Sequence, residues 1–208
     1  MYAVSVRLSF VALLLVYSIP GCGSSTTSGP GTATGGTTGT GGGGASGGTA
    51  GALDPTAFGN TYKISDNAQM PSWTQDPTTP LWTGKGTDLS SIIDGGNMPY
   101  LQRGCLLAMY QSLVGPGTQI CTLVAMDFVT EAQATDMFNY EQQHTGASVP
   151  IPGYDASVAI GYPGITSMTV YAHFKAMYYE VQLDGNSDQT SSSQVASTFL
   201  KVLEAKGK

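Results

Sequence analysis

The pattern of apolar and polar residues divides the chain into three parts. Residues 8–19 form a short, mainly apolar run, residues 23–51 are mostly Gly, Thr and Ser without a charged side chain, and apolar and polar positions alternate only after that. We therefore expect a removable leader at 1–21, a linker at 22–53 and a folded domain at 54–208. About 155 residues suit one domain that buries roughly 70% of its unfolded surface.

Five stretches of the domain are predicted β-strands, and the last two of them show the period-two alternation of apolar and polar positions. Residues 106–114 and 119–128 flank a Gly-Pro-Gly-Thr sequence at 115–118, which predicts a hairpin. The other three expected strands are joined by short turns and span residues 157–162, 167–174 and 177–183. Because strands joined by tight turns pair antiparallel, the sheet should be largely antiparallel.

Helix-start signals follow the strands. A capping-box pattern at residues 130–133 predicts a helix that runs to about Gln143. A second pattern of this kind at residues 191–194 predicts a C-terminal helix. The apolar side of that helix is expected to carry Val195, Phe199, Val202 and Leu203.

Together these elements predict a single α+β domain with a largely antiparallel sheet of about five strands and packed helices, including the C-terminal helix. Residues 54–86 are rich in Pro, Asp and Thr, and we expect them to be irregular, with Trp73 and Trp82 pinning them to the core. A short helix through Leu89 should follow and end at Gly95-Gly96.

The leader has the three parts of a secretory signal, with Arg7 as its charge, the apolar run, and the small residue Gly21 at its end. The run is shorter than the roughly 20 residues that cross a bilayer core, which favours a signal over a membrane span. The sequence Ile19-Pro20-Gly21-Cys22 resembles the lipobox of bacterial lipoproteins; Ile19 and Gly21 match it and Pro20 departs from it. An ordinary secretory signal with an incidental cysteine is the alternative.

The resemblance implies that the chain is cut before Cys22, whose thiol then carries a diacylglycerol group. Acyl chains contribute roughly 0.8 kcal/mol per buried methylene, so two or three of them hold a protein stably at a membrane. Gly23 follows Cys22 in place of an aspartate, which by the same resemblance implies the outer membrane. We therefore expect a lipid-anchored protein of the cell envelope, on a flexible linker with a span of roughly 30 Å.

The charge balance restricts the partners. The chain has 8 Lys and Arg against 14 Asp and Glu, and its net charge is −6. The basic residues are scattered and form no patch that would neutralise phosphates, so nucleic acid is not an expected partner. The expected partners are the membrane, through the lipid on Cys22, and an envelope protein or glycan.

One block of the domain is similar to a bacterial protein family of unknown function. Residues 88–96 read Asp-Leu-Ser-Ser-Ile-Ile-Asp-Gly-Gly and precede Tyr-Leu-x-x-Gly at 100–104. The block resembles that family's pattern L-x-x-x-I-(D/N)-G-G-A-x-x-Y-L-x-x-G, with Asn97 in place of the alanine. The resemblance covers roughly residues 87–145 and implies the order of the elements, but it assigns no activity and no catalytic residue.

Two cysteines belong to the domain, Cys105 and Cys121. The expected hairpin places Cys121 beside Ser112 and Cys105 beside Phe128, which separates the two by roughly 23 Å along the strand. A disulfide needs Cα atoms within about 7 Å of each other, so we expect two buried, inert thiols. A bridge remains the alternative, because the envelope is an oxidising compartment.

The ionisable residues form no recognisable chemical motif. The sequence has no metal-ligand spacing, no P-loop and no Gly-x-Ser-x-Gly elbow. We therefore expect no catalytic, cofactor-binding or metal-ligating residues. For the acidic residues Asp127, Glu131, Asp155 and Glu180 the expected role is solvated surface charge.

The aromatic residues give the best indication of a binding surface. Trp73, Tyr162, Tyr171 and Tyr179 are the candidate ligand-binding aromatics, and on a concave face they would take a glycan or a peptide. The alternative is that these side chains are core and rim residues of the sheet.

The leading hypothesis for function is a non-enzymatic binding or assembly module displayed from a membrane. A hydrolase is one alternative, with residues that meet only in the fold, such as Asp127, Glu131 and His144. A purely structural envelope subunit is the other.

The lipobox makes a direct prediction about Cys22. Cells that express the full chain and are fed a fatty-acid analogue should label the wild-type protein, because the thiol of Cys22 carries the lipid. The Cys22→Ala chain should remain unlabelled, as seen by gel detection of the analogue. Equal labelling of both chains would contradict the assignment.

Overall fold

The computed structural model describes residues 54–65, 69–93, 96–144 and 146–207. The expected signal, Cys22, the linker and Gly95 lie outside these ranges. Within the described ranges, no helix combines the length and the apolar character needed to cross a membrane.

The described residues form an α+β domain whose sheet has eight strands, where about five were expected. The helices are α1 (Pro55–Tyr62), the 3-10 helix η1 (Gly86–Ser91), α2 (Met98–Gln102), α3 (Glu131–His144) and α4 (Gln189–Lys206). The strands are β1 (Thr74–Gln75), β2 (Trp82–Lys85), β3 (Cys105–Val114), β4 (Ile120–Phe128), β5 (Val149–Pro150), β6 (Ala159–Pro163), β7 (Ser167–Phe174) and β8 (Met177–Asp184).

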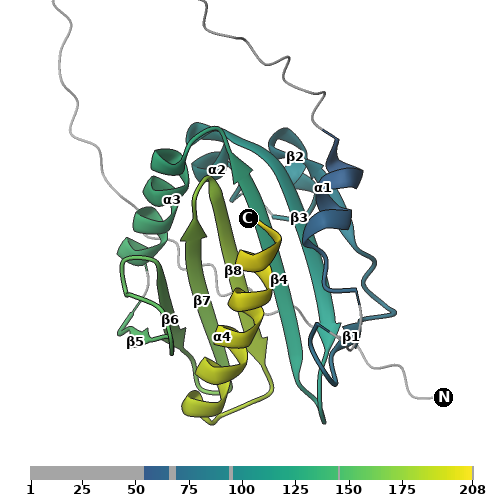
Figure 1. Cartoon of the computed structure of the whole chain (residues 1–208), viewed down its shortest axis with the longest axis vertical. Coiled ribbons are helices and arrows are strands. Elements are labelled where there is room, and N and C mark those ends of the chain that lie inside the picture. The colour runs from purple at the N-terminus through teal and green to yellow at the C-terminus, as the bar shows by residue number, and fades with distance from the viewer. Residues whose placement is uncertain (1–53, 66–68, 94–95, 145, 208) are drawn as a thin grey trace, which may run out of the picture. The chain divides into compact units, whose positions relative to one another are not determined.

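All strand pairs are antiparallel, and the order is β1-β3-β4-β8-β7-β6-β5, with β2 also paired to β3. β8 is the last strand in the sequence, yet it lies between β4 and β7 in the middle of the sheet. α1 and α4 pack on one face of the sheet, and η1, α2 and α3 pack on the other (Figure 1). The apolar core is therefore divided by the sheet into two clusters.

The predicted hairpin of β3 and β4 is present. Cys105 pairs with Phe128 as expected, and Cys121 pairs with Leu113, one position from the predicted Ser112. Gly117 has a φ of 67° in the connecting turn, a conformation that favours glycine. The position of the turn at residues 115–118 was thus sufficient to predict their register to within one residue.

The helix starts were predicted with different success. α3 has the expected capping box, because the amide of Thr130 donates to Gln133 Oε1 at 3.0 Å and the amide of Gln133 donates to Thr130 Oγ1 at 3.3 Å. α4 begins earlier than predicted, since Asp188 accepts hydrogen bonds from the amides at positions 190 and 191 at 3.0 and 3.3 Å. Ser192 and Ser193 consequently lie inside the helix and are buried.

The expectation of irregular structure at residues 54–86 is wrong for three elements. α1 begins there with Pro55 in its first turn, and Asp54 caps it by accepting from two backbone amides at 2.9 and 3.2 Å. β1 and β2 are only two and four residues long, too short to show alternation in the sequence. The helix through Leu89 is a 3-10 helix that ends at Ser91.

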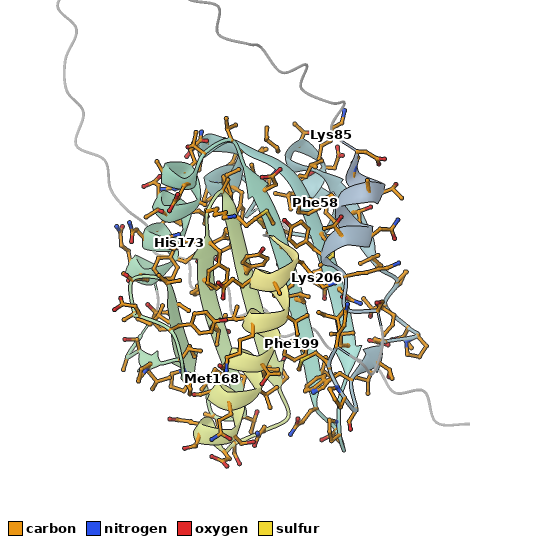
Figure 2. The ribbon with its side chains drawn as sticks, viewed as in Figure 1. Phe58, Lys85, Met168, His173, Phe199 and Lys206 are labelled. Carbon is orange, nitrogen blue, oxygen red and sulfur yellow. The ribbon has the colours of Figure 1, made fainter. Side chains whose placement is uncertain are left out.

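The cluster beneath α1 and α4 is closed by an aromatic contact between distant segments. Trp73, just before β1, meets Phe199 of α4 edge-on with ring centroids 5.2 Å apart. Trp73 is 4% exposed and Phe199 is fully buried. Figure 2 shows Phe199 and Phe58 of α1 on the same side of the sheet. The expectation that Trp73 anchors its segment to the core is therefore fulfilled by a contact with the C-terminal helix.

Removing the Trp73 ring should destabilise the fold strongly. Trp73→Ala is expected to lower the free energy of unfolding by about 3–5 kcal/mol, because it loses the burial of the ring and leaves a cavity against Phe199. Ile165→Ala is the matched control, because Ile165 is 93% exposed in the β6–β7 turn, and a change of less than about 0.5 kcal/mol is expected there. Urea denaturation measures both, and equal losses would contradict the packing described.

Candidate functional site

One line of side chains crosses the sheet on the face that carries η1, α2 and α3. The strand register places its members directly opposite one another from β2 to β6. We call this line the Glu180 row; its members are Trp82, Tyr110, Val124, Glu180, Tyr171 and Ile160. It places a carboxylate in the middle of a sheet, between Val124 and Tyr171.

The Glu180 row lies where the helix layer ends. On one side of it, Ala108, Met126 and Tyr178 are buried in the cluster that includes Met137 and Phe138 of α3. On the other side the facing residues are largely polar and, apart from Ser112, only partly buried; they are Ser112, Thr122, Gln182, Thr169 and Tyr162. The row thus borders a helix-covered region on one side and a polar, partly exposed region of the same sheet on the other.

A compact group of acidic and phenolic side chains surrounds Glu180, and we call it the Glu180 site. It consists of Glu180, Glu141 of α3, Tyr100 of α2, Tyr171 and Tyr178. The Tyr100 hydroxyl donates to Glu141 Oε1 at 3.2 Å. The rings of Tyr171 and Tyr178 are stacked with centroids 6.3 Å apart and an interplanar angle of 20°. Residues from two strands and two helices therefore converge at one place.

The electrostatics of the Glu180 site favour protonated forms. Burial, and secondarily the negative charge of Glu141, raises the pKa of Glu180 to about 7. Burial together with Glu180 and Glu141 also raises the pKa of Tyr100, Tyr171 and Tyr178, so these phenols stay protonated near neutral pH. Glu180 is therefore the member of the site that titrates close to neutrality.

The hydroxyl of Tyr178 is buried without a hydrogen-bond partner among the described residues. The side chain is fully buried, and the carboxylates of Glu180 and Glu141 are near enough to raise its pKa. Buried polar groups are nearly always hydrogen-bonded, so an orphaned hydroxyl beside two carboxylates marks this site as unusual.

Arg103, at the end of α2, is engaged beside the site by α3. Its Nε lies 2.7 Å from Asp136 Oδ2, and its Cζ lies 4.3 Å from the ring centre of Tyr140. Nη1 also donates to the carbonyl of Pro99 at 3.1 Å. The guanidinium thus joins α2 to α3 and helps to fix the position of Tyr100 and Glu141.

The structure divides the predicted aromatic residues between the two faces of the sheet. Tyr162 and Tyr171 lie together, with ring centroids 5.8 Å apart, beside the Glu180 site. Trp73 and Tyr179 lie in the cluster on the opposite face, where both are buried. Those two are core residues; Tyr171 is also buried, in the cluster on its own face, so Tyr162 is the one of the four that is partly exposed.

The cysteines are free and buried, as expected. Burial, with a smaller contribution from Asp127, raises the pKa of Cys105 to about 12, and burial likewise raises the pKa of Cys121. Such thiols are not activated as nucleophiles. Among the described residues, no group of three or more potential ligands is placed to hold a metal ion.

The three residues of the hydrolase hypothesis are not brought together. Asp127 is half-buried and shares its lateral row with Leu107 and Met177, and burial raises its pKa. Glu131 and His144 are the first and last residues of α3. A helix of 14 residues separates its ends by roughly 20 Å. One active site cannot contain both ends of this helix.

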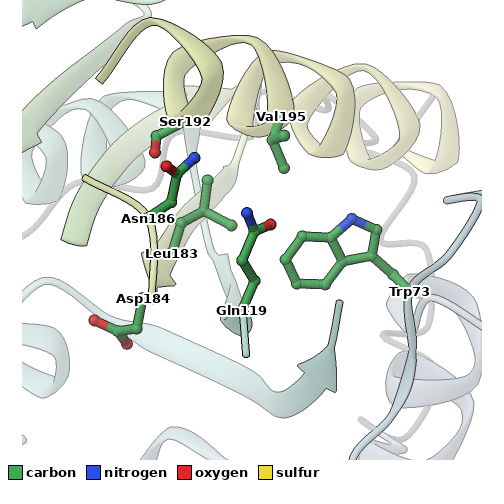
Figure 3. A pocket seen from close by; sticks show the side chains of 7 residues that line it. All are labelled: Trp73, Gln119, Leu183, Asp184, Asn186, Ser192 and Val195. Atoms are coloured by element: carbon green, nitrogen blue, oxygen red, sulfur yellow. The ribbon is translucent and has the colours of Figure 1, made fainter. Parts of the chain in front are cut away.

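Two hollows lie away from the Glu180 site. One, of about 280 Å³, is lined by residues that include Glu131, His173, Lys175 and Glu204. His173 is already engaged there, with Nε2 2.9 Å from the carbonyl of Ser157 and Nδ1 3.3 Å from Thr135 Oγ1. The other, between Trp73 and the start of α4, is too narrow to admit a water molecule (Figure 3).

Comparisons with known proteins leave the function open. No family model and no curated protein matches the chain. Among solved structures, the extracellular domain of PknH from Mycobacterium tuberculosis is similar, with 11% sequence identity and a TM-score of 0.46. The match covers 74% of this chain and 97% of that chain. So distant a similarity carries no argument about the site.

Sequence reasoning missed Glu180 and Glu141 as site residues. Glu180 alternates with Tyr179 and Val181 and therefore indicated an ordinary solvent-facing position. Glu180 differs from a solvent-facing residue because its cross-strand neighbours Tyr171 and Val124 and the helix that carries Glu141 surround its carboxyl group. None of these contacts is visible in a local stretch of sequence.

The raised pKa of Glu180 predicts a pH dependence of stability. Burial raises the pKa of Glu180 from the ordinary 4.5 to about 7. Between these values the folded protein keeps a proton that the unfolded chain releases, so stability falls as pH rises through this window. Glu180→Gln removes this loss and should stabilise the protein at pH 8 by on the order of 2 kcal/mol, and far less at pH 5.

Chemical denaturation at both pH values measures the effect. Glu131→Gln is the control, because Glu131 is an exposed residue at the start of α3. A Glu180→Gln protein with the same stability gain at pH 5 and pH 8, or with none at pH 8, would contradict the assignment.

Proposed function

We propose that the protein is a non-enzymatic binding module, displayed from the cell envelope by a lipid on Cys22, and that its ligand binds at the Glu180 site. The observation that carries the proposal is the buried, unpartnered hydroxyl of Tyr178, on the strand that also carries Glu180. A bound ligand would supply the hydrogen bond that the described residues do not.

The position of the site in the fold supports this function. Glu180 and Tyr171 stand directly opposite each other on paired strands, and the ion pair of Arg103 and Asp136 joins the two helices beside them. Side chains held on paired strands and packed helices are already ordered before binding, which lowers the entropic cost of holding a ligand. The neighbouring Tyr162, Thr169 and Gln182 give the ligand further polar and aromatic contacts.

The proposed attachment to a membrane is argued from the sequence. The lipobox resemblance at Cys22, the uncharged linker after it and the acidic domain together favour a module held at a membrane surface by lipid. An envelope protein and a glycan remain the alternative partners. The acidic balance argues against nucleic acid.

A hydrolase is the second candidate, and the Glu180 site is the observation that favours it. A carboxyl group with a pKa near 7 beside a second carboxylate is the arrangement of a general acid in hydrolytic enzymes. Release of a cleaved product from the captured ligand would favour this function over simple binding.

A structural subunit has less support. The large apolar side chains that are exposed in the described part of the chain lie at separate places, namely in α2, at the start of β4, after β4 and in the β6–β7 turn; they are Met98, Ile120, Val129 and Ile165. A docking surface would need a contiguous apolar patch.

Photo-crosslinking in intact cells tests the proposed function. A benzophenone side chain at position 162, in place of Tyr162, should form adducts on illumination, because the residue borders the Glu180 site. The same side chain in place of Tyr154 is the matched control, since that tyrosine packs on Phe174 on the opposite face of the sheet. Mass spectrometry of the purified protein should find adducts at position 162 and none of the same kind at position 154.

The outcome is decisive in either direction. An adduct found only at position 162 supports a ligand at the Glu180 site. Identical adduct patterns at both positions, or none at position 162, would overturn the proposed function.

A further inference from the structure

We propose that the ligand of the Glu180 site is a small organic amine, whose protonated amino group is held by Glu180, Glu141 and the hydroxyl of Tyr178. This inference rests on the proposed binding function and adds the chemical class of the ligand.

The charge of the site is the first argument. Two carboxylates lie near each other, on β8 and α3, and no hydrogen bond or ion pair within the described residues holds that of Glu180. Arg103, the cation at the end of α2, is paired with Asp136 at 2.7 Å. An anionic ligand would add a third negative charge to a partly buried place, which costs free energy. A cation instead balances the charge already present.

The hydroxyl of Tyr178 is the second argument, and it is independent of charge. The side chain is fully buried, and its oxygen has no hydrogen-bond partner among the described residues. A phenolic oxygen can accept a hydrogen bond, and an ammonium group offers three donors and no acceptor. An ammonium group can therefore donate to both carboxylates and to Tyr178 at once, whereas a quaternary amine has no N–H to donate.

The aromatic and apolar neighbours fit the rest of such a ligand. The rings of Tyr171 and Tyr178 are stacked and Tyr162 lies 5.8 Å from Tyr171, so π-faces lie next to the carboxylates and attract cations. Along the Glu180 row, Val124 and Tyr110 follow on β4 and β3. Val124 is buried, whereas Tyr110 is partly exposed. Neighbouring strands are about 4.8 Å apart, so the Tyr110 ring lies roughly 10 Å from Glu180, within reach of a chain of methylene groups.

Binding of an ammonium group should be linked to proton release. The groups that face Glu180 are Val124 from β4, Tyr171 from β7, Glu141 from α3 and Tyr100 from α2, besides Tyr178 on β8 itself. The phenols have raised pKa values and stay protonated, whereas Glu180 titrates near neutrality. A bound cation lowers the pKa of Glu180, so the carboxyl group loses its proton as the amine binds.

Calorimetry of the full chain in detergent tests the proposal, with 1,5-diaminopentane as the probe and 1,5-pentanediol as its uncharged counterpart. The amine should bind and the diol should not. Ionisation of Glu180 from pH 6 to pH 8 should increase the affinity about tenfold for a pKa near 7. Titrations in buffers of different ionisation enthalpy should show proton release at pH 6.5.

Two matched pairs of variants test whether amine binding depends on Glu180 and on the Tyr178 hydroxyl. Glu180→Gln should weaken amine binding at least tenfold and abolish the proton release, whereas Glu131→Gln should change neither. Tyr178→Phe should weaken binding roughly threefold to tenfold through loss of one charge-assisted hydrogen bond, whereas Tyr179→Phe should not. Tyr179 is an apt control, because it is the next residue on β8, is equally buried, and lies on the opposite face of the sheet.

Equal binding of the diol and the amine, or unchanged binding after Glu180→Gln, would overturn the proposal, as would no binding of the amine at any pH. Thermal melts show whether each variant is folded. If the Glu180→Gln protein does not fold, Tyr178→Phe provides a second test of amine binding at the site. An adduct at position 162 without amine binding would refute the amine and leave the binding function in place. If neither an adduct at position 162 nor amine binding is found, both the binding function and the amine ligand are refuted.

Discussion

The fold depends on the pairing of β8 with β4 and β7. β8 is the last strand to be made, and its insertion closes the sheet between the β3–β4 hairpin and the β6–β7 hairpin. One side of β8 carries Tyr179, Val181 and Leu183 into the cluster beneath α4, and the other side carries Tyr178, Glu180 and Gln182. The period of two in a strand therefore ties the core and the candidate site to the same eight residues. A shift of register by one position would bury Glu180 in the core and expose Tyr179, so the core also fixes the place of the carboxylate.

The Glu180 site is a place where the fold accepts an unfavourable local arrangement. A carboxylate in the middle of a sheet, next to Val124 and a tyrosine and near a second carboxylate, gains little from its surroundings, and its raised pKa expresses that penalty. A hydrophobic residue at position 180 would continue the cluster of Tyr178 and Met126 without this cost. Departures of this kind from local consistency are expected at functional sites.

The sequence predicted the parts of the fold that have strong local signals. The β3–β4 hairpin, the capping box of α3 and the three strands before α4 were all readable, because each is long or carries a specific turn or cap. The short strands β1, β2 and β5 were not, since two to four residues cannot show a period. Of the four aromatics named from the sequence, Tyr162 and Tyr171 lie at or beside the Glu180 site, whereas Trp73 and Tyr179 lie in the cluster on the opposite face. Glu141, which meets Tyr100 across 41 positions of sequence, was not predicted. Convergence over that distance is a property of the sheet order, which no local pattern contains.

The contact between the two ends of the described domain bears on how a pull on the chain would travel through the fold. Lys206, near the end of α4, donates from Nζ to the carbonyls of Thr61 and Lys63 at 3.2 and 3.0 Å, and so fastens the C-terminal helix to α1. The chain enters the fold at Asp54, at the start of α1, whose Phe58 packs in the cluster on the face opposite Glu180. A pull on the entering chain would therefore be transmitted into α1, α4 and the cluster between them. The Glu180 site lies on the opposite face of the sheet, but its strand β8 also carries Tyr179 and Val181 into that cluster, so such a pull would reach the site through β8.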